Sequence, residues 1–161
     1  MPTTPAAVKL DGFTSVTDIE KQTTTVWFSG TSVTKGNCLI IDTGATLPTG
    51  IDRAWKVCTT ANTGLGAVIA AETISGGPAT GSALKVYTNG HLTGATHGII
   101  ADSGAIALGA LVSTSATSGA LGTATGTYGA AVGESVIGVC VKAFTASTAD
   151  GEILLRQSHW V

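Results

Sequence analysis

The sequence predicts an all-β protein, a small β-barrel or sandwich built from two similar halves and preceded by an extended N-terminal arm. Three observations favour this fold class. The chain of 161 residues contains 22 Gly and 27 Thr, and both residue types are unfavourable inside helices. Short runs of β-branched and aromatic residues recur between Gly, Pro, Asn and Asp. One order of strand-like runs also occurs twice along the chain, which indicates an internal repeat.

The predicted arm covers residues 1–25, ahead of a single β domain at residues 26–161. The arm contains two Pro residues and scattered charges before the first convincing strand. Fully extended, 25 residues reach roughly 80 Å at ~3.3 Å per residue, enough to cross onto a neighbouring subunit. The simpler alternative is a frayed terminus.

The β domain is expected to contain nine strands bounded by turn-forming residues. They are predicted at residues 24–28, 38–41, 54–59, 67–73, 83–88, 99–101, 110–113, 135–143 and 152–157. A tight turn is predicted at Asn89-Gly90, because both residue types tolerate positive φ. Strands at this spacing are typical of barrels and sandwiches.

The repeat is predicted to join a unit at about residues 30–90 to one at about 104–161. The matching segments are 34–40 with 107–113, 66–72 with 136–142, and 82–87 with 152–157. The offset between matched segments changes only slightly from the first match to the last, so a small insertion or deletion in the loops accounts for the difference. Either half alone is a marginal sheet that needs the other to cover its apolar face. We therefore expect two similar halves packed on one core.

Composition restricts the classes of partner. Only 11% of the residues are charged and the formal net charge is −2, which gives no basic footprint for nucleic acid or an anionic membrane surface. The apolar runs are too short to span a bilayer as helices. So little charge favours association with other protein surfaces, and we expect a homo-oligomer.

The cysteines and histidines give no ligand pattern. Cys38, Cys58 and Cys140 are odd in number and lie in apolar runs, so we expect buried structural thiols instead of a disulfide framework. His91 and His97 are expected in surface loops, with a shared metal ion as the alternative. No cofactor or metal ion is predicted.

One segment resembles a catalytic motif. Leu39-Ile40-Ile41-Asp42-Thr43-Gly44-Ala45 and the later Ser135-Val136-Ile137-Gly138 resemble two elements of retroviral-type aspartic proteases. The resemblance implies that Asp42 supplies half of a carboxylate dyad in a homodimer. Against this, Thr46-Leu47-Pro48-Thr49 departs from the family's continuation, and the second element continues as a predicted strand where the family has a helix. Asp-Thr-Gly also suits an ordinary β-turn. We expect no enzymatic activity, with the aspartic protease as the alternative.

A wider resemblance covers residues from about 30 to 161. It is carried by a cadence of Gly-headed and apolar strands: residues 35–40, 66–70, 83–90, 108–112, 136–139 and 152–155. This cadence is similar to that of small tailed-phage capsid decoration proteins, also called head-stabilising, cement or capsid fibre proteins. The resemblance implies a non-enzymatic β-barrel or β-tulip-like protein on the exterior of an icosahedral capsid, often a trimer, with the major capsid protein as its partner. The N-terminal arm matches no motif of that family. Another virion protein, of a tail or fibre, is a second alternative.

Three aromatic residues are candidates for contact with a capsid. Trp27 and Phe28 follow the arm, and Trp160 is the penultimate residue. Aromatic side chains bury ~150–250 Å² each, and Trp is enriched among interface hot spots. The alternative is that Trp27 and Phe28 alternate in a strand, one facing the core, while Trp160 closes a barrel end.

Overall fold

The computed structural model describes residues 21–62, 66–124 and 136–156 and confirms an all-β fold, with 41% strand and 3% helix. The strands are β1 (Gln22–Phe28), β2 (Cys38–Ile41), β3 (Trp55–Val57), β4 (Val68–Ala70), β5 (Ser82–Thr93), β6 (Leu111–Thr114), β7 (Leu121–Thr123), β8 (Gly138–Lys142) and β9 (Glu152–Leu155). A single turn of helix, α2 (Gly94–His97), follows β5.

The first five strands form a closed barrel. Their order is β1-β3-β2-β4-β5, and pairing between β1 and β5 closes the circle. Neighbouring strands run antiparallel except β1 and β3, which are parallel and meet only where Phe28 pairs with Trp55. Phe28, Leu39 and Val68 belong to the core of this barrel. Only Phe28, the last residue of β1, pairs with β3. The rest of β1 therefore pairs with β5 alone.

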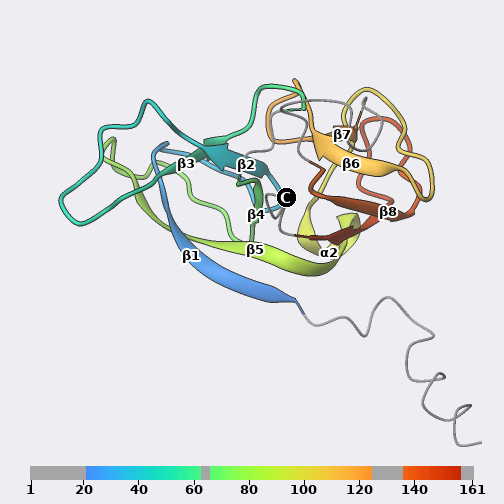
Figure 1. Ribbon diagram of the computed structural model, residues 1–161, viewed down its shortest axis with the longest axis horizontal. Helices are drawn as coiled ribbons and strands as arrows, with labels where there is room; N and C mark the ends of the chain where they lie inside the picture. The colour runs from blue at the N-terminus through green and yellow to red at the C-terminus, as the bar shows by residue number, and fades with distance from the viewer. Residues whose placement is uncertain (1–20, 63–65, 125–135, 157–161) are drawn as a thin grey trace, which may run out of the picture.

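The second half continues the same sheet beside the first. Beyond the shared strand β5 the order is β9-β8-β6-β7, so β5 passes under both groups of strands (Figure 1). Ala101, after α2, makes a parallel bridge with Leu121 of β7, as Phe28 does with Trp55. This bridge gives the second half the same circular order of segments as the first.

Two cores are present where we expected one. Successive side chains of a strand point to opposite faces. Leu39 and Val68 therefore enter the first barrel, while Cys38 and Ile69 from the same strands pack into the core of the second half. Strands β2 and β4 thus serve as the wall between the two cores.

Two isolated bridges recur in the two halves at the spacing of the segments matched in the sequence. Val33 bridges Ile74 in the first half, and Ile106 bridges Phe144 in the second. Residues 33 and 106 are separated by the same number of residues as the matched segments 34–40 and 107–113. Residues 74 and 144 are separated by the same number as the segments 82–87 and 152–157. The closing strand differs. Ile69 pairs with Tyr87 and the equivalent Val139 pairs with Leu154, so Tyr87 corresponds to position 154 and not to position 157. The connection before the last strand is therefore shorter in the second half than predicted.

The Asn89-Gly90 turn prediction is wrong. Both residues lie inside β5, which continues from the first barrel into the second half. Gly90 has φ +112°, and the side chain of Asn89 accepts a hydrogen bond from Gly90 N at 3.0 Å. The positive φ of Gly90 therefore belongs to an irregularity within β5 and not to a turn. This irregularity lies opposite the shift in strand register between Gln22 and Thr23 of β1.

Other differences concern boundaries. Strand β1 begins at Gln22, so residues 22–25, which we placed in the arm, pair with β5. Strand β7, Leu121–Thr123, was not among the predicted strands. It has only three residues, one of them Gly122, so the sequence shows no strand pattern there. The strand predicted at residues 99–101 is reduced to the bridge of Ala101.

Candidate functional site

Asp42, the only catalytic candidate, lies at the end of β2 with its carboxylate held by three neighbours. Ser29 Oγ donates to Asp42 Oδ2 at 2.7 Å, and Lys56 Nζ lies 3.1 Å from Oδ1. Gly44 N also donates to Oδ1, at 3.2 Å, which closes a turn. The hydrogen bond from Ser29 and then the interactions with Lys56 and Gly44 hold the pKa of Asp42 below its ordinary value. The lowered pKa favours the ionised form of Asp42 in the single chain.

The same hydrogen bond occurs in the second half with its two residues exchanged. Ser115 Oγ donates to Asp102 Oδ2 at 2.7 Å. Ser29 is equivalent to Asp102 and Asp42 to Ser115, because both pairs have the offset that relates Val33 to Ile106. In both halves the carboxylate also accepts a hydrogen bond from the backbone N–H of the glycine two residues later, Gly44 after Asp42 and Gly104 after Asp102. This recurrence indicates that Asp42 fastens the strand ends of the repeat unit.

The two histidines are buried, which corrects the prediction of surface loops. His91 lies in β5 with 3% of its surface exposed, and its Nε2 is 2.7 Å from Glu152 Oε2. His97 ends α2 with 4% exposed; Thr93 N donates to its Nδ1 at 2.8 Å, and Lys21 Nζ lies 3.3 Å from its Nε2. Burial, followed by the charge of Lys21, lowers the pKa of His97. Each ring thus has a structural partner.

The three cysteines are free and buried, as predicted. Burial raises the pKa of Cys38 and of Cys140. A thiol that stays protonated is a poor nucleophile and a poor metal ligand. In the part of the chain that the structure describes, no group of three or more His, Cys, Asp or Glu side chains could hold a metal ion.

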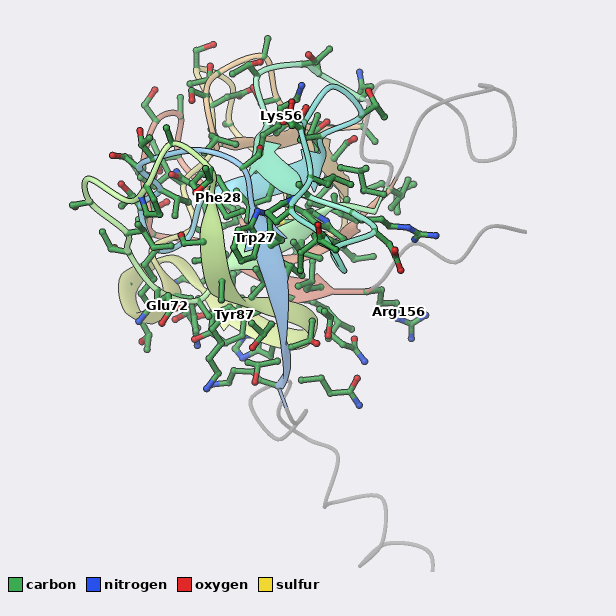
Figure 2. The ribbon with its side chains drawn as sticks, turned by 90° about the vertical axis from the view of Figure 1, so that its left-hand side faces the viewer. Trp27, Phe28, Lys56, Glu72, Tyr87 and Arg156 are labelled. Atoms are coloured by element: carbon green, nitrogen blue, oxygen red, sulfur yellow. The ribbon has the colours of Figure 1, made fainter. Side chains whose placement is uncertain are left out.

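The aromatic candidates have different environments. Phe28 is 1% exposed and lies in the core of the first barrel, so it has no surface to offer a partner. Trp27, its neighbour on β1 (Figure 2), is half-buried. Its indole donates to Thr80 O at 3.2 Å and lies against Gly81. Trp160 lies outside the described residues. Only Trp27 remains as a described candidate for contact.

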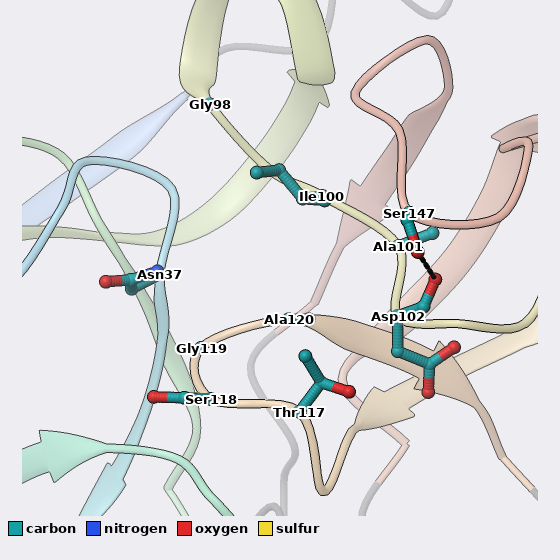
Figure 3. A pocket seen from close by; sticks show the side chains of 10 residues that line it. All are labelled: Asn37, Gly98, Ile100, Ala101, Asp102, Thr117, Ser118, Gly119, Ala120 and Ser147. Atoms are coloured by element: carbon teal, nitrogen blue, oxygen red, sulfur yellow. Dashed lines mark hydrogen bonds between the residues drawn. The ribbon is translucent and has the colours of Figure 1, made fainter.

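Two of the concavities in the described structure differ in size and position. A groove of about 850 Å³ runs along β1 on the first barrel and is lined by Trp27, Ile51, Arg53 and Trp55 among others. A smaller pocket of about 190 Å³ lies where the two halves meet, next to Asn37, Gly98 and Gly119 (Figure 3). Asp42, the carboxylate of the protease resemblance, lines neither of them. No sequence pattern indicated the groove, because its lining comes from separate strands and loops.

Comparison of the sequence with known protein families and proteins identifies no relative. The chain matches no protein-family model and no curated protein sequence. Among the described residues, no helix has the length and apolar character needed to cross a membrane.

Proposed function

We propose that this protein is a structural virion protein that binds the exterior of a phage capsid and stabilises the shell. The observation that carries the proposal is the exchanged Asp–Ser pair: the one carboxylate with a catalytic motif has the same structural role as Asp102 in the other half. The choice of partner, the major capsid protein, rests on the resemblance of residues 30–161 to capsid decoration proteins.

The surface also supports an architectural role. Charged residues make up 11% of the chain, so two such surfaces can approach with little electrostatic repulsion. Both cores are filled by buried side chains, and the two halves share one sheet, which favours a rigid body. Such a body suits a protein that must hold neighbouring capsid subunits in place.

Microscopy of particles tests the proposal directly. Purified shells that lack the protein are mixed with the recombinant chain and examined by cryo-electron microscopy. We expect additional density at symmetry-related positions on the outer surface and a higher temperature of shell disruption. Shells without added density at saturating protein concentration would contradict the proposal.

The enzyme alternative has its own test. Wild-type protein and Asp42→Asn are incubated with an unstructured peptide library between pH 4 and 7. We expect no cleavage by either protein. Cleavage that disappears in Asp42→Asn would instead establish the aspartic protease.

A further inference from the structure

Strand β1 has one paired edge and one open edge. The backbone groups of successive strand residues point alternately to the neighbour on one side and to the neighbour on the other. Ser29 N donates to Trp55 O at 2.9 Å, which directs the backbone of Ser29 towards β3. By this alternation the N–H and C=O groups of Thr23 and Thr25 point away from β5. On that side they meet no strand among the described residues, because β3 pairs only with Phe28.

The pairing on the other edge of β1 agrees with this assignment. Ala71 N donates to Lys85 O at 2.9 Å, so the backbone of Lys85 points towards β4 and not towards β1. Lys85 lies opposite Thr25 in the register of β1 and β5. These two residues therefore face each other without hydrogen bonds, and Val26 and Leu84 form the hydrogen-bonded pair beside them. In the described part of the chain, the N–H and C=O of Thr25 are left for another strand.

The open edge carries few of the features that normally protect an edge strand. Charged side chains, Pro residues and bulges usually prevent such an edge from pairing with another chain. Residues 23–27 are Thr-Thr-Thr-Val-Trp, without charge or Pro, and the first three are exposed. The register shift of β1 lies before this stretch, at Gln22. The edge is therefore suited to take up an additional strand.

The groove along this edge has a mixed lining that fits an added strand. Its volume is about 850 Å³, and Thr24, Thr25, Trp27, Ile51 and Trp55 are among the residues that line it. Successive side chains of a strand point to opposite sides, so an added strand meets both hydroxyl groups and apolar rings there. In strand addition, main-chain hydrogen bonds supply the affinity and side-chain contacts supply the selectivity. A partly polar groove therefore suits an extended backbone.

The 20 residues ahead of Lys21 contain a segment of matching character. Residues 13–17, Phe-Thr-Ser-Val-Thr, are the longest stretch of residues 1–20 without Pro, Gly or a charged residue. They combine one aromatic residue, one Val and three hydroxyl side chains, as residues 23–27 do. Five strand residues span about 17 Å in either segment. The stretch thus matches the open edge in length and in composition.

The short connection to β1 favours a second copy as the donor of this segment. Only residues 18–21 separate it from β1, so it would have to reverse within four residues to reach the open edge of its own chain. Short hairpin loops usually place at least one residue at positive φ, which Ile19, Glu20 and Lys21 rarely adopt. Pairing with a second copy needs no reversal, and four extended residues bridge about 13 Å to it.

We propose that copies of this protein exchange their N-terminal arms, with residues 13–17 of one copy added as a strand to the open edge of β1 in another. Each exchange supplies hydrogen-bond partners for the backbones of Thr23 and Thr25 and covers part of the groove. Every copy offers one arm and one edge, so exchange between two copies closes a dimer and exchange around a ring closes a larger oligomer. The contact does not depend on the proposed capsid partner.

Hydrogen exchange and sedimentation velocity of the full chain, measured at the same concentrations, test whether a second copy occupies the edge. We expect the Thr25 amide to exchange about tenfold or more slowly in the associated protein than in the monomer. The Val26 amide, which pairs with β5, is the internal control and stays protected in both states.

Three results of this experiment would overturn the proposal. The first is a protein that stays monomeric from micromolar to millimolar concentrations. The second is a Thr25 amide that exchanges equally fast in the monomer and in the associated protein. The third is a Thr25 amide that is protected in the monomer, which is the result expected if the arm of the same chain occupies the edge.

Proline variants of the full chain locate the two sides of the contact. Thr25→Pro removes the N–H that points into the groove and leaves the hydrogen bonds to β5 intact. The double variant Ser15→Pro/Val16→Pro removes the N–H that the added strand would donate, whichever of the two residues faces β1. We expect each variant alone to associate about tenfold more weakly than wild-type protein. An equimolar mixture should form complexes that contain both, because one variant supplies an intact arm and the other an intact edge.

The control for the arm variant is Ala6→Pro/Ala7→Pro, which places the same number of Pro residues outside residues 13–17. It should associate as wild-type protein does, and calorimetry of dilute protein should give all three variants melting temperatures close to that of wild-type protein. Normal association of Thr25→Pro, a mixture that stays monomeric, or an equal effect of the control would rule out the exchange of arms.

Discussion

Asp42 and Asp102 hold opposite places in one recurring hydrogen bond, each paired with a serine 13 residues away. The bond needs one carboxylate and one hydroxyl, and either order satisfies both groups. A duplicated sequence can therefore exchange the two residues without losing the contact. This freedom explains why the Asp-Thr-Gly motif occurs once and not twice.

Replacing Asp42 tests its structural role. Asp42→Asn keeps an acceptor for Ser29 but removes the ion pair with Lys56, so we expect a loss of about 1 kcal/mol in the free energy of unfolding at pH 7. Because the folded pKa of Asp42 is lowered, this contribution is present above its unfolded pKa of about 4 and is lost as the pH falls through the folded pKa.

Urea denaturation at pH 7, 5 and 3 measures this difference. Wild-type protein and Asp42→Asn should differ by a constant amount at pH 7 and 5 and by a smaller amount at pH 3. The control, Asp52→Asn, removes an exposed carboxylate of the same loop, and we expect a change of no more than about 0.5 kcal/mol. A difference for Asp42→Asn that persists unchanged at pH 3 would contradict the ionic contribution.

His97 predicts a second dependence on pH. Its folded pKa is lowered, so the unfolded chain takes up the proton first and the protein loses stability as the pH falls below about 6.5. In His97→Gln this part of the slope should disappear from plots of unfolding free energy against pH. A ring-proton NMR titration of the wild-type protein gives the pKa directly, and a midpoint at or above 6.5 would contradict the prediction.

Among the elements, equivalent segments have different tasks in the two halves. Residues 22–24 are the start of strand β1 in the first half, whereas the equivalent positions 95–97 belong to α2 in the second. Thr93 caps α2 by accepting from Thr96 N, and Gly98 ends it with φ +77°. Gly98 also lies against Gly36 of the first half, so the helix cap and the contact between halves depend on one residue.

The turns at residues 34–37 and 107–110 provide a matched pair of substitutions. Gly36 and Gly109 have φ of +90° and +79°, so alanine costs about 1–2 kcal/mol at either position. Only Gly36 also faces the Gly98 backbone, and the overpacking there should add about 1–3 kcal/mol. In urea denaturation of dilute protein, Gly36→Ala should therefore lose clearly more stability than Gly109→Ala. Equal losses of stability would show that the backbone around Gly98 can move to accommodate the added methyl group without a loss of unfolding free energy.

For the molecule as a whole, truncation tests where the arm ends and the fold begins. Residues 22–25 pair with β5, so a chain that begins at residue 21 keeps the fold, whereas one that begins at residue 26 loses part of β1. If the proposed function holds, removal of residues 1–20 should weaken attachment to shells and leave the melting temperature nearly unchanged.

Removal of residues 1–25 is the comparison for that experiment. It should lower the melting temperature by about 2–4 °C for each kcal/mol lost. Calorimetry and shell-binding assays on both truncations separate the two effects. Unchanged shell binding after removal of residues 1–20 would exclude the arm as a contact, and a large fall in melting temperature would place those residues in the fold.

Residue type and order were sufficient to predict the fold class and the burial of the cysteines. Thr, Val and Gly disfavour helices, and apolar runs alternate with turns. The bridges of Val33 and Ile106 to their partners keep the offsets found between the matched segments. Composition and the alternation of apolar runs with turns are local properties of the sequence. The matched segments are found by comparing one stretch of the chain with another.

The way in which the halves meet depended instead on contacts between distant segments. Asn89-Gly90 has the composition of a turn, but pairing with β1 in the first barrel and with β9 in the second half keeps it within a strand. His91 and His97 are buried by partners far away in the sequence, and Asp42 is held by Ser29 and Lys56. The groove beside β1 likewise depends on which strands become neighbours. Neighbour relations arise from packing free energy summed over the whole chain, so no short sequence pattern contains them.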